Sequence, residues 1–428
     1  MTSGGNWPSV PLAELAASTK GAIVGGPFGS DLVANDYVSE GVPVVRGRNL
    51  PKAERFSYDN LVYVSEAKAD ALHLNCARPG DLVFTQRGTL GQVGVIPDDS
   101  PYPRFLISQS QMKMTVDPAK AEPLYLYYYF RLPATVANIE NHALQAGVPH
   151  INLGILRKLQ VLAPPRAVQR KIAAILSAYD DLIANNQRRI ALLESMAEEI
   201  YREWFVRMRF PGHETTPFEK GLPHGWRVCA VSEVLTEQKS PIKRSNLSSV
   251  ERYVGLEHIP RKSIALNDWG SPGAVESDKL RFAVGDILFG KIRPYLHKVA
   301  LASFDGACST DTIVLRPNSP EVRAFGLFTV FSTTFIDFAT TASKGTKMPR
   351  ADWHYLKCLE IRMPSRALLQ RFEKTTDPML AEIGCLLKVN RQLSVQRDAL
   401  LPRLISGKLK VDHLDIQLPP SMREKVTA

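Results

Sequence analysis

The sequence has no long hydrophobic run. None of its apolar stretches approaches the roughly eighteen residues that a membrane-spanning helix needs. The first ten residues, MTSGGNWPSV, lack the basic and then apolar pattern of a secretory signal peptide. We therefore expect a cytoplasmic protein that makes no membrane contact.

Cysteine is scarce, and the chain has no pattern typical of a metal site. The sequence has no CxxC motif, no His/Cys pair at ligand spacing, and no HExxH among its nine histidines. We expect free, mostly buried thiols and no bound metal. The five cysteines are Cys76, Cys229, Cys308, Cys358 and Cys385.

Motifs of the common nucleotide and DNA chemistries are also missing. There is no GxxxxGKS/T phosphate loop, and the glycine-rich segment GGPFGS at Gly25 lacks GxGxxG spacing and is better explained as a surface turn. No Asn-Pro-Pro-aromatic tetrapeptide of the amino-methyltransferases occurs. Asp98 and Asp99 are not followed by the Glu-x-Lys of a nuclease, and a turn explains them. We expect a non-catalytic chain without a cofactor of its own.

The composition favours an acidic partner and several domains. The formal charge is +10 and the isoelectric point is about 9.3, which favours a polyanion such as nucleic acid without proving one. A chain of 428 residues is long enough for two or three domains.

A stretch from Pro165 to Phe205 has the pattern of a long helix that needs a partner helix. Alternating steps of four and three residues select ten positions, nine of them apolar, with charged residues between them. These seam positions are Ile172, Leu176, Tyr179, Ile183, Asn186, Ile190, Leu193, Ala197, Ile200 and Trp204.

A second helix of this kind is predicted two hundred residues later. Its seam is interrupted by Thr376, Asn390 and Arg397, and its apolar positions are Phe372, Met379, Ile383, Leu386, Leu393, Leu400 and Leu404. We interpret the two helices as one antiparallel coiled coil within the chain; two unrelated core helices are the alternative. The asparagines Asn186 and Asn390 cost stability but can fix the register. Pro378, preceded by Asp377, predicts that the second helix begins or kinks there.

The two halves of the chain share an ordered set of short similarities. GDLVFTQRGTLGQVGVI, from Gly80, matches GDILFGKIRPYLHKVAL, from Gly285: each is a Gly-Asp turn, an apolar strand, a basic loop and a second strand. LRKLQVLAPPRA, from Leu156, matches LKCLEIRMPSRA, from Leu356. Similarities in the same order at a nearly constant offset are typical of a duplicated unit.

The sequence therefore predicts an α+β fold with a pseudo-twofold, duplicated architecture. Two similar globular domains are separated and joined by two long antiparallel helices that form a coiled coil. The predicted segments are a first domain at 1–164, a helix at 165–209, a linker at 210–225, a second domain at 226–364, a second helix at 365–407 and a loosely held tail at 408–428.

Several of these segments resemble the specificity subunits of type I restriction-modification systems. IYREWFVRMRFPGHE, from Ile200, and LLPRLISGKL, from Leu400, are similar to the ends of that family's two helical regions. The Gly-Asp strand with its basic loop, and the pattern PxINxxxLxxLxVxxPP from Pro149 to Pro165, resemble its target recognition domains. The second domain departs from this pattern, because GTKMPRADWHYLKCL lacks the Ile-Asn pair.

The resemblance implies a DNA-binding subunit that gives a larger complex its sequence specificity. In that family each target recognition domain reads one half of a split target in double-stranded DNA. Two methyltransferase subunits hold the helical spacer and methylate adenine with S-adenosylmethionine. Two motor-nuclease subunits add ATP- and Mg-dependent translocation and cleavage. These cofactors are therefore expected on the partner subunits.

The candidate DNA contacts are basic and polar residues in the predicted loops, because phosphates attract cations and base edges pair with Arg, Lys, Asn or Gln. Gly88 and Gly91 would allow the DNA backbone to approach Gln86 and Arg87 closely. In the first domain the candidates are Arg46, Arg48, Gln86, Arg87 and Thr89, with Gln109 and Gln111 weaker ones; in the second they are Lys291, Arg293, Tyr295, Lys344, Lys347 and Arg350.

Two groups of aromatic residues have alternative explanations. Ile200, Trp204 and Phe205 belong either to the coiled-coil seam or to a methyltransferase contact, and the sequence does not separate these. The tyrosines of LYLYYYF, from Leu124, are better explained by helix packing than by base stacking.

Two rival functions remain open at this stage. The first is a coiled-coil scaffold whose duplicated domains bind acidic protein partners. The second is an enzyme with a degenerate methyltransferase or nuclease site.

Overall fold

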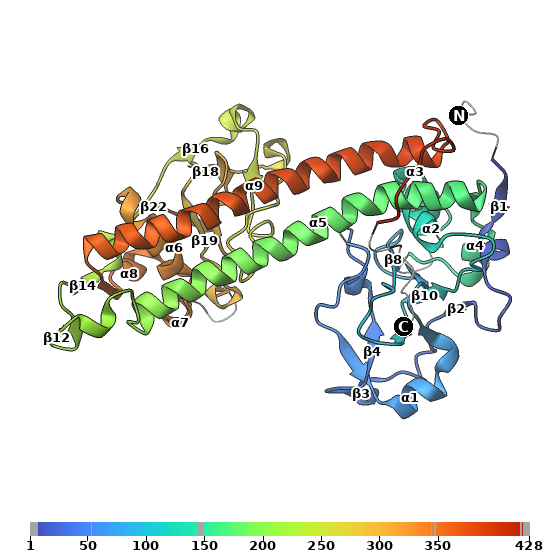
Figure 1. Cartoon of the computed structure of the whole chain (residues 1–428), viewed down its shortest axis with the longest axis horizontal. Helices are drawn as coiled ribbons and strands as arrows, with labels where there is room; N and C mark the ends of the chain where they lie inside the picture. The colour runs from blue at the N-terminus through green and yellow to red at the C-terminus, as the bar shows by residue number, and fades with distance from the viewer. Residues whose placement is uncertain are drawn as a thin grey trace. The chain divides into compact units, whose positions relative to one another are not determined.

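The computed structural model describes residues 7–52, 54–143, 149–343, 345, 348–419 and 422. The chain divides into two compact units. Unit 1 comprises Met1–Asn185 with Arg391–Ala428, and unit 2 comprises Asn186–Asn390. Two long helices, α5 (Arg166–Tyr201) and α9 (Arg366–Ile405), each contribute residues to both units (Figure 1).

Unit 1 contains two larger sheets and a strand pair. The first sheet is antiparallel, with the strand order β2-β10-β7-β8: Ile23–Gly25, Gln111–Met114, Leu82–Thr85 and Val93–Val95. The second has the order β3-β5-β4-β9-β6: Tyr37–Val38, Val62–Val64, Val42–Val45, Phe105–Ile107 and Cys76–Ala77. Within it β4 and β9 run parallel. The strands β1 (Ser9–Pro11) and β11 (Gln160–Leu162) pair antiparallel.

Four short helices complete unit 1. They are α1 (Glu66–Ala71), α2 (Pro123–Phe130), α3 (Pro133–Asn141) and α4 (Leu153–Lys158). The apolar sequence of α2 is explained by its position, because Tyr125, Tyr127 and Tyr128 are all buried in the core of this unit. The prediction that these tyrosines serve helix packing is confirmed.

Unit 2 also contains two larger sheets. The first has the order β15-β22-β19-β20 and is antiparallel: Leu235–Glu237, Thr312–Pro317, Ile287–Gly290 and Val299–Leu301. The second has the order β16-β18-β21-β17: Pro241–Ile242, Lys279–Phe282, Gly306–Cys308 and Tyr253–Val254. Two strand pairs are added, β12 (Phe218–Glu219) with β13 (Leu222–Pro223), and β14 (Arg227–Ala230) with β23 (Glu360–Met363).

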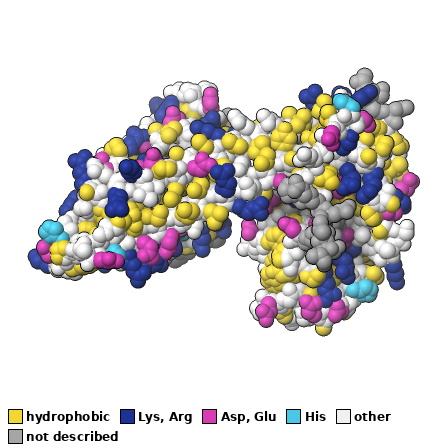
Figure 2. Space-filling view, viewed as in Figure 1, with side chains coloured by type: hydrophobic (Ala, Val, Ile, Leu, Met, Phe, Trp, Pro, Cys, Tyr) yellow, Lys and Arg dark blue, Asp and Glu magenta, His cyan; other side chains and the backbone are white. Residues whose placement is uncertain are grey.

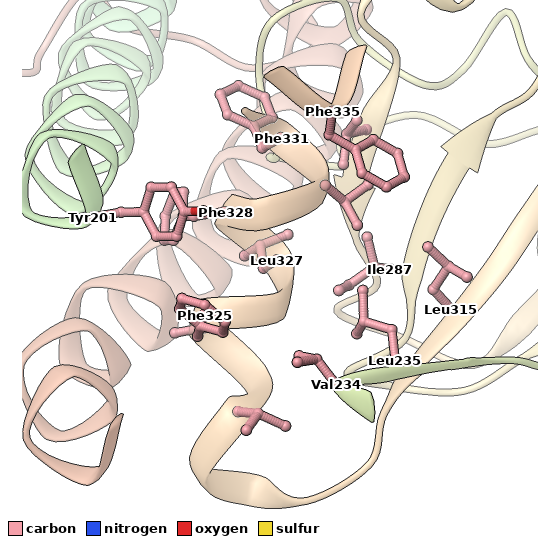
Figure 3. Close-up of a cluster of buried hydrophobic side chains, with 14 of the residues drawn as sticks. Tyr201, Val234, Leu235, Ile287, Leu315, Phe325, Leu327, Phe328, Phe331 and Phe335 are labelled. Atoms are coloured by element: carbon pink, nitrogen blue, oxygen red, sulfur yellow. The ribbon is translucent and has the colours of Figure 1, made fainter. Parts of the chain in front are cut away.

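The core of unit 2 lies on both sides of one buried helix. This helix, α6 (Arg323–Phe331), is followed by α7 (Thr333–Thr341) and α8 (Trp353–Leu356). Phe325 and Phe328 of α6 lie against Tyr201 of α5, with ring centroids 5.9 and 6.0 Å away (Figure 3). Ile287 and Leu315 lie on the sheet side of α6 (Figure 3). The helix is apolar all round because it is covered on both sides.

The predicted α+β class is confirmed, since each unit combines mainly antiparallel sheets with separate helices. The domain boundaries drawn from the sequence stay predictions. Among the described residues no single helix is long and apolar enough to cross a membrane. One bent pair, Pro320–Phe331 with Thr333–Thr341 at 57°, meets the length and composition requirement.

The seam positions of both long helices face inward. All twenty are buried or half-buried, including the three that interrupt the apolar pattern of α9. Within unit 1, the guanidinium of buried Arg397 pairs with Asp180 at 2.6 Å. Within unit 2, the buried Asn390 pairs with Asn186, and Thr376 donates its hydroxyl to the Phe372 carbonyl at 2.9 Å. Each interruption therefore has a polar partner, as a buried polar group requires.

The second helix does not begin at Pro378, so that part of the expectation was wrong, whereas a kink at this proline stays a prediction. Helix α9 is assigned without a break through this proline, although an interior proline costs about 3 kcal/mol. Phe372 and Leu380 on either side are buried, and burial of two such side chains contributes about 3–6 kcal/mol, which outweighs that cost. Asp377 pairs with Arg323 of α6, which explains its presence before the proline.

The C-terminal segment after α9 is also more tightly held than expected. Val411 is buried, and the Asp412 carbonyl accepts a hydrogen bond from Lys171 at 2.7 Å. Further on, Ser177 donates its hydroxyl to the sulfur of Met422 at 3.4 Å. Within the described part of the predicted tail at 408–428, these residues pack on unit 1, whereas residues 408, 410, 412–415 and 417 are exposed. The prediction of a loosely held tail therefore does not hold at Val411, Asp412 and Met422 and stays a prediction for the rest.

Candidate nucleic-acid interface

Three loops of unit 1 meet at one edge of its sheets. Because β4 and β9 run parallel, their ends lie together, and Ser108 donates its N–H to the Val45 carbonyl at 2.9 Å. The loop after β7 joins them, since the Gln86 N–H donates to the Ser110 carbonyl at 2.7 Å. We call the residues 46–50, 86–91 and 108–110 the unit 1 loop cluster. It contains six of the seven candidate DNA contacts predicted for the first domain, all except Gln111.

The motif around Asn152 holds this cluster in place. Ile151 is buried and donates its N–H to the Gln86 carbonyl at 3.0 Å. Asn152 caps α4 by accepting the Ile155 N–H at 2.8 Å. The Ile-Asn pair thus positions the loop after β7 and starts the next helix.

Of the predicted contacts in the cluster, Arg48, Arg87, Thr89 and Gln109 are exposed. Gln109 is partly engaged, because its amide donates to the Leu32 carbonyl at 2.8 Å. Gln86 is half-buried, whereas Gln111 is buried and accepts a hydrogen bond from Ser108. Gln111 is therefore unable to read DNA without rearrangement.

Arg46 is engaged within its own unit. Its guanidinium donates to the Asn60 carbonyl at 2.6 Å, and its Nε is buried without a hydrogen-bond partner among the described residues. Burial, with the nearby charge of Arg48, lowers the pKa of Arg46. A direct DNA contact by Arg46 stays a prediction, but it needs this side chain to change partners.

Sequence reasoning missed Asn49, which organises the turn between Arg46 and Leu50. Asn49 is fully buried. Its amide donates to the carbonyls of Ser57 and Asp59 at 3.0 and 3.1 Å, and its oxygen accepts the Arg46 N–H at 3.0 Å. The polar residue inside an otherwise basic turn was the only signal for this role.

The loop after β19 in unit 2 is held in a corresponding way. Lys291 donates its N–H to the Asp311 carbonyl at 3.0 Å and accepts the Ala351 N–H at 2.9 Å. Asp352 then caps α8 by accepting the His354 N–H at 2.9 Å. Ala351 and Asp352 thus make here the contacts that Ile151 and Asn152 make in unit 1. An aspartate accepts this hydrogen bond as well as an asparagine does.

The predicted contacts of this second loop are mostly accessible. Arg293 is exposed and has a positive φ of 51°, Tyr295 is 54% exposed, and Lys291 is half-buried. Arg350 is exposed and lies 3.6 Å from the Asp311 carboxylate. Lys344 and Lys347 lie outside the described residues.

The Gly-Asp turns have the same geometry in both units. Gly80 and Gly285 take the positive φ values of 85° and 87°, which favour glycine. The Asp81 carboxylate accepts the Arg78 N–H at 2.9 Å, and the Asp286 carboxylate accepts the Ala283 N–H at 2.8 Å. Both carboxylates are buried and form an ion pair: Asp81 with Lys113 at 3.3 Å, and Asp286 with Arg316 at 2.7 Å.

In each unit, carboxylates of α5 also hold a loop that hydrogen-bonds to the edge strand of the first sheet, β8 in unit 1 and β20 in unit 2. In unit 1, Arg55 donates to Asp181 at 3.0 Å and to Asp180 at 3.4 Å. In unit 2, Glu194 accepts hydrogen bonds from Ser263 and the N–H groups of the next two residues, at 2.8 to 2.9 Å. Burial raises the pKa of the Glu194 carboxyl, and these hydrogen bonds oppose that shift.

The long helices expose apolar side chains that sequence reasoning missed. On α5 in unit 2, Leu192 and Met196 are 64% and 51% exposed and share one face at a spacing of four residues. Leu182, Val389 and Val395 are exposed as well.

Of the predicted partner contacts, Ile200 and Trp204 are half-buried, whereas Phe205 is 4% exposed and packs on Phe325 and Phe372. Burial favours the seam explanation for Phe205.

The charged surface is mixed. On the face drawn in Figure 2, Lys and Arg side chains are interspersed with Asp and Glu.

The described residues contain no group of three or more His, Cys, Asp or Glu side chains that could hold a metal ion. One hollow of unit 2 is lined by charges that pair with one another, such as Arg316 with Asp286 and Arg323 with Glu373.

Comparison with known proteins shows which family this chain resembles. Residues 35–195 match the family described as the type I restriction modification DNA specificity domain. These residues are similar to a type I specificity domain. The resemblance seen in the sequence is thereby confirmed.

Similarity to relatives extends beyond these residues. The MjaIX specificity subunit of a type I restriction enzyme from Methanocaldococcus jannaschii is 22% identical over 422 residues, which cover 92% of each chain. The EcoDI specificity subunit from Escherichia coli is 26% identical over 297 residues, covering 61% of this chain and 63% of that protein. A crystal structure of the type I S subunit from M. genitalium has the same fold, with a TM-score of 0.58, 15% identity, and coverage of 94% of this chain and 99% of that one.

Proposed function

We propose that this protein is the non-catalytic DNA-specificity subunit of a type I restriction-modification complex. Each unit reads one half of a bipartite target in double-stranded DNA. The observation that carries the proposal is the repeated loop framework. In both units the loop after the central strand is tied to the turn before the next strand and to a helix cap, with basic and polar side chains left exposed.

This repetition supports the duplicated architecture that the sequence predicts. The strand orders β2-β10-β7-β8 and β15-β22-β19-β20 follow the same path, and the Gly-Asp turns use the same hydrogen bonds. Two copies of one reading module fit a split target, because each module then contacts its own half-site.

The long helices serve as the spacer between the half-sites. Helix α5 has 36 residues, which corresponds to about 54 Å at 1.5 Å per residue. That exceeds one turn of DNA, about 34 Å. An antiparallel coiled coil of α5 with α9 is stiff enough to set the gap of unread base pairs.

The helices also dock the methyltransferase subunits. The exposed Leu192 and Met196 form an apolar surface on α5, and such surfaces are typical of protein contacts. Two methyltransferase subunits bring S-adenosylmethionine, and two motor-nuclease subunits bring ATP and Mg. This chain contributes target recognition and needs no cofactor of its own. The complex acts in the cytoplasm.

The test is the salt dependence of duplex binding by the full chain with a methyltransferase subunit. Neutralised phosphates release counterions, so the logarithm of the affinity should fall steeply and linearly with the logarithm of salt concentration. A scaffold that binds acidic proteins would show no sequence-selective duplex binding under any salt condition. That result would contradict the proposal.

A further inference from the structure

Phe28 is the most exposed large hydrophobic side chain among the described residues, at 83%. A phenyl ring in water gives up the stabilisation that burial would provide. Single exposed apolar residues are common on protein surfaces, so the exposure of Phe28 matters only because of how its loop is held and where it lies.

The loop that carries Phe28 is fixed at both ends. Before Phe28, the Gly25 carbonyl accepts a hydrogen bond from Asn75 at 2.7 Å, and Pro27 is buried. After Phe28, the Asp31 N–H donates to the Phe28 carbonyl at 2.9 Å, which closes a turn. The buried proline also fixes the backbone directly before the exposed ring. The protein therefore holds this ring in solvent by defined contacts.

The loop lies directly against the unit 1 loop cluster. At Gly26 a β-carbon would come 2.0 Å from the Ser108 carbonyl oxygen, so only glycine permits this close approach. The Gly26 N–H donates to the Gln111 carbonyl at 2.8 Å, and Gln109 donates its amide to the Leu32 carbonyl at 2.8 Å. Phe28 thus belongs to the same edge of unit 1 as the predicted DNA contacts.

We propose that Phe28 stacks on the bases of the DNA duplex beside the first half-site, inserting its ring at a base step. This inference rests on the proposed function and adds a residue to it. Apolar wedges and aromatic rings bind bases through their faces without hydrogen bonds. Phe28 therefore contributes affinity and local distortion of the duplex, whereas neighbouring polar groups read base edges. The corresponding segment of unit 2, residues 238–252, contains no Phe, Tyr or Trp, so this wedge serves one half-site only.

The experiment compares four full-length chains, each with a methyltransferase subunit: wild type, Phe28→Ala, Phe28→Trp and the control Phe218→Ala. Phe218 is a 55% exposed phenylalanine on β12, in the linker hairpin of unit 2. Duplexes that the wild type selects from a random-sequence pool provide the target. Binding is measured by titration, and duplexes with 5-iododeoxyuridine at successive positions are photocrosslinked and the attached peptide identified.

We expect Phe28→Ala to weaken binding about 5- to 100-fold, the effect of removing one base–aromatic stack. Phe28→Trp and Phe218→Ala should bind within about threefold of wild type, and crosslinks near the first half-site should map to residue 28. Unchanged thermal melting of Phe28→Ala would show that folding is intact, as its exposure predicts.

Three outcomes overturn the inference. Wild-type binding by Phe28→Ala, with no crosslink at residue 28, would exclude the stack; a loss in Arg87→Ala would then show that the proposed function still stands. Impaired assembly of Phe28→Ala with a methyltransferase subunit, at unchanged duplex affinity, would assign the ring to a protein contact. Failure of the wild type to select any duplex would overturn the proposed function and the wedge together.

Discussion

Asn186 donates a hydrogen bond from its side-chain amide to the side-chain oxygen of Asn390 at 2.8 Å. Both residues are buried seam positions of the long helices. The pair satisfies polar groups that would otherwise be buried without partners, and it is formed only when these two positions face each other. It therefore selects one alignment of the helices over shifted ones.

A double-mutant cycle measures this coupling. Asn390→Leu alone should destabilise the protein by about 1–3 kcal/mol, because it leaves the Asn186 amide buried without this partner. Asn186→Leu with Asn390→Leu should recover most of that loss, since two leucines pack as an apolar pair. Chemical unfolding of the four variants provides the free energies. Simple addition of the two single effects would show that the asparagines are not coupled.

The ion pair of Arg397 with Asp180 should contribute more than a surface pair. Its two side chains are only 8% and 11% exposed. Removal of Arg397 breaks a charge-assisted hydrogen bond of the buried Asp180 carboxylate, which keeps Arg55 and Tyr128 as partners. Arg397→Ala should therefore cost about 1.5–3 kcal/mol in unfolding free energy.

Arg189→Ala is the matched control for this comparison. Arg189 pairs with Glu382 at 2.7 Å between the same two helices, but its side chain is 51% exposed. Its loss should cost less than about 1 kcal/mol. Equal losses in the two variants would contradict the role assigned to burial.

The sequence predicted which positions of the long helices are buried, but it did not predict the partners of their buried polar side chains. The four-three pattern located both seams, because burial of an apolar stripe depends only on local spacing. The pattern marked Arg397 only as an interruption of the apolar seam. Local spacing does not reveal the partner of Arg397, because Asp180 lies 217 positions away in the sequence. The prediction of a helix start at Pro378 was wrong for a similar reason. Burial of Phe372 and Leu380 outweighs the local helix-breaking tendency of the proline.

The candidate site was predicted in part. Strand-then-basic-loop patterns located Arg87 and Lys291 in loops that the structure ties to helix caps. Solvent exposure was beyond sequence reasoning, because Gln109 and Gln111 differ by two positions and only one is exposed. Phe28 was explained as part of a surface turn, and its position beside Gln109 follows from contacts between segments about eighty residues apart.

Arg87→Ala should weaken recognition of one half-site and leave the other unchanged. Arg87 is exposed, and its backbone is held beside His150, so the substitution removes a cation without disturbing the loop. Loss of one good base contact costs about 1–3 kcal/mol at that position. Footprinting on the selected duplex checks this, with Arg293→Ala as the counterpart in unit 2. An unchanged footprint would remove Arg87 from the reading surface.

His297 should make unit 2 less stable in mild acid. Burial lowers the pKa of His297, aided by the charge of Lys262. Because the folded-state pKa lies below the unfolded value of about 6.5, the unfolded chain binds the extra proton first. Stability should be full above about pH 6.5 and fall as the pH drops below it.

The substitution His297→Asn isolates this effect. His297 has a positive φ of 52°, which asparagine tolerates well. The difference in melting temperature between pH 7.5 and 5.5 should be smaller in His297→Asn than in wild type. An equal difference would show that other groups account for the acid sensitivity.

The most direct test of the central claim changes the length of both long helices. Four residues inserted before Ile183, with four in the facing part of α9, lengthen the spacer by about 6 Å, or about two base pairs. Methylome sequencing of cells that carry this variant with its methyltransferase should show both half-sites unchanged and a longer gap of unread base pairs between them. New half-site sequences at the old spacing would contradict the account.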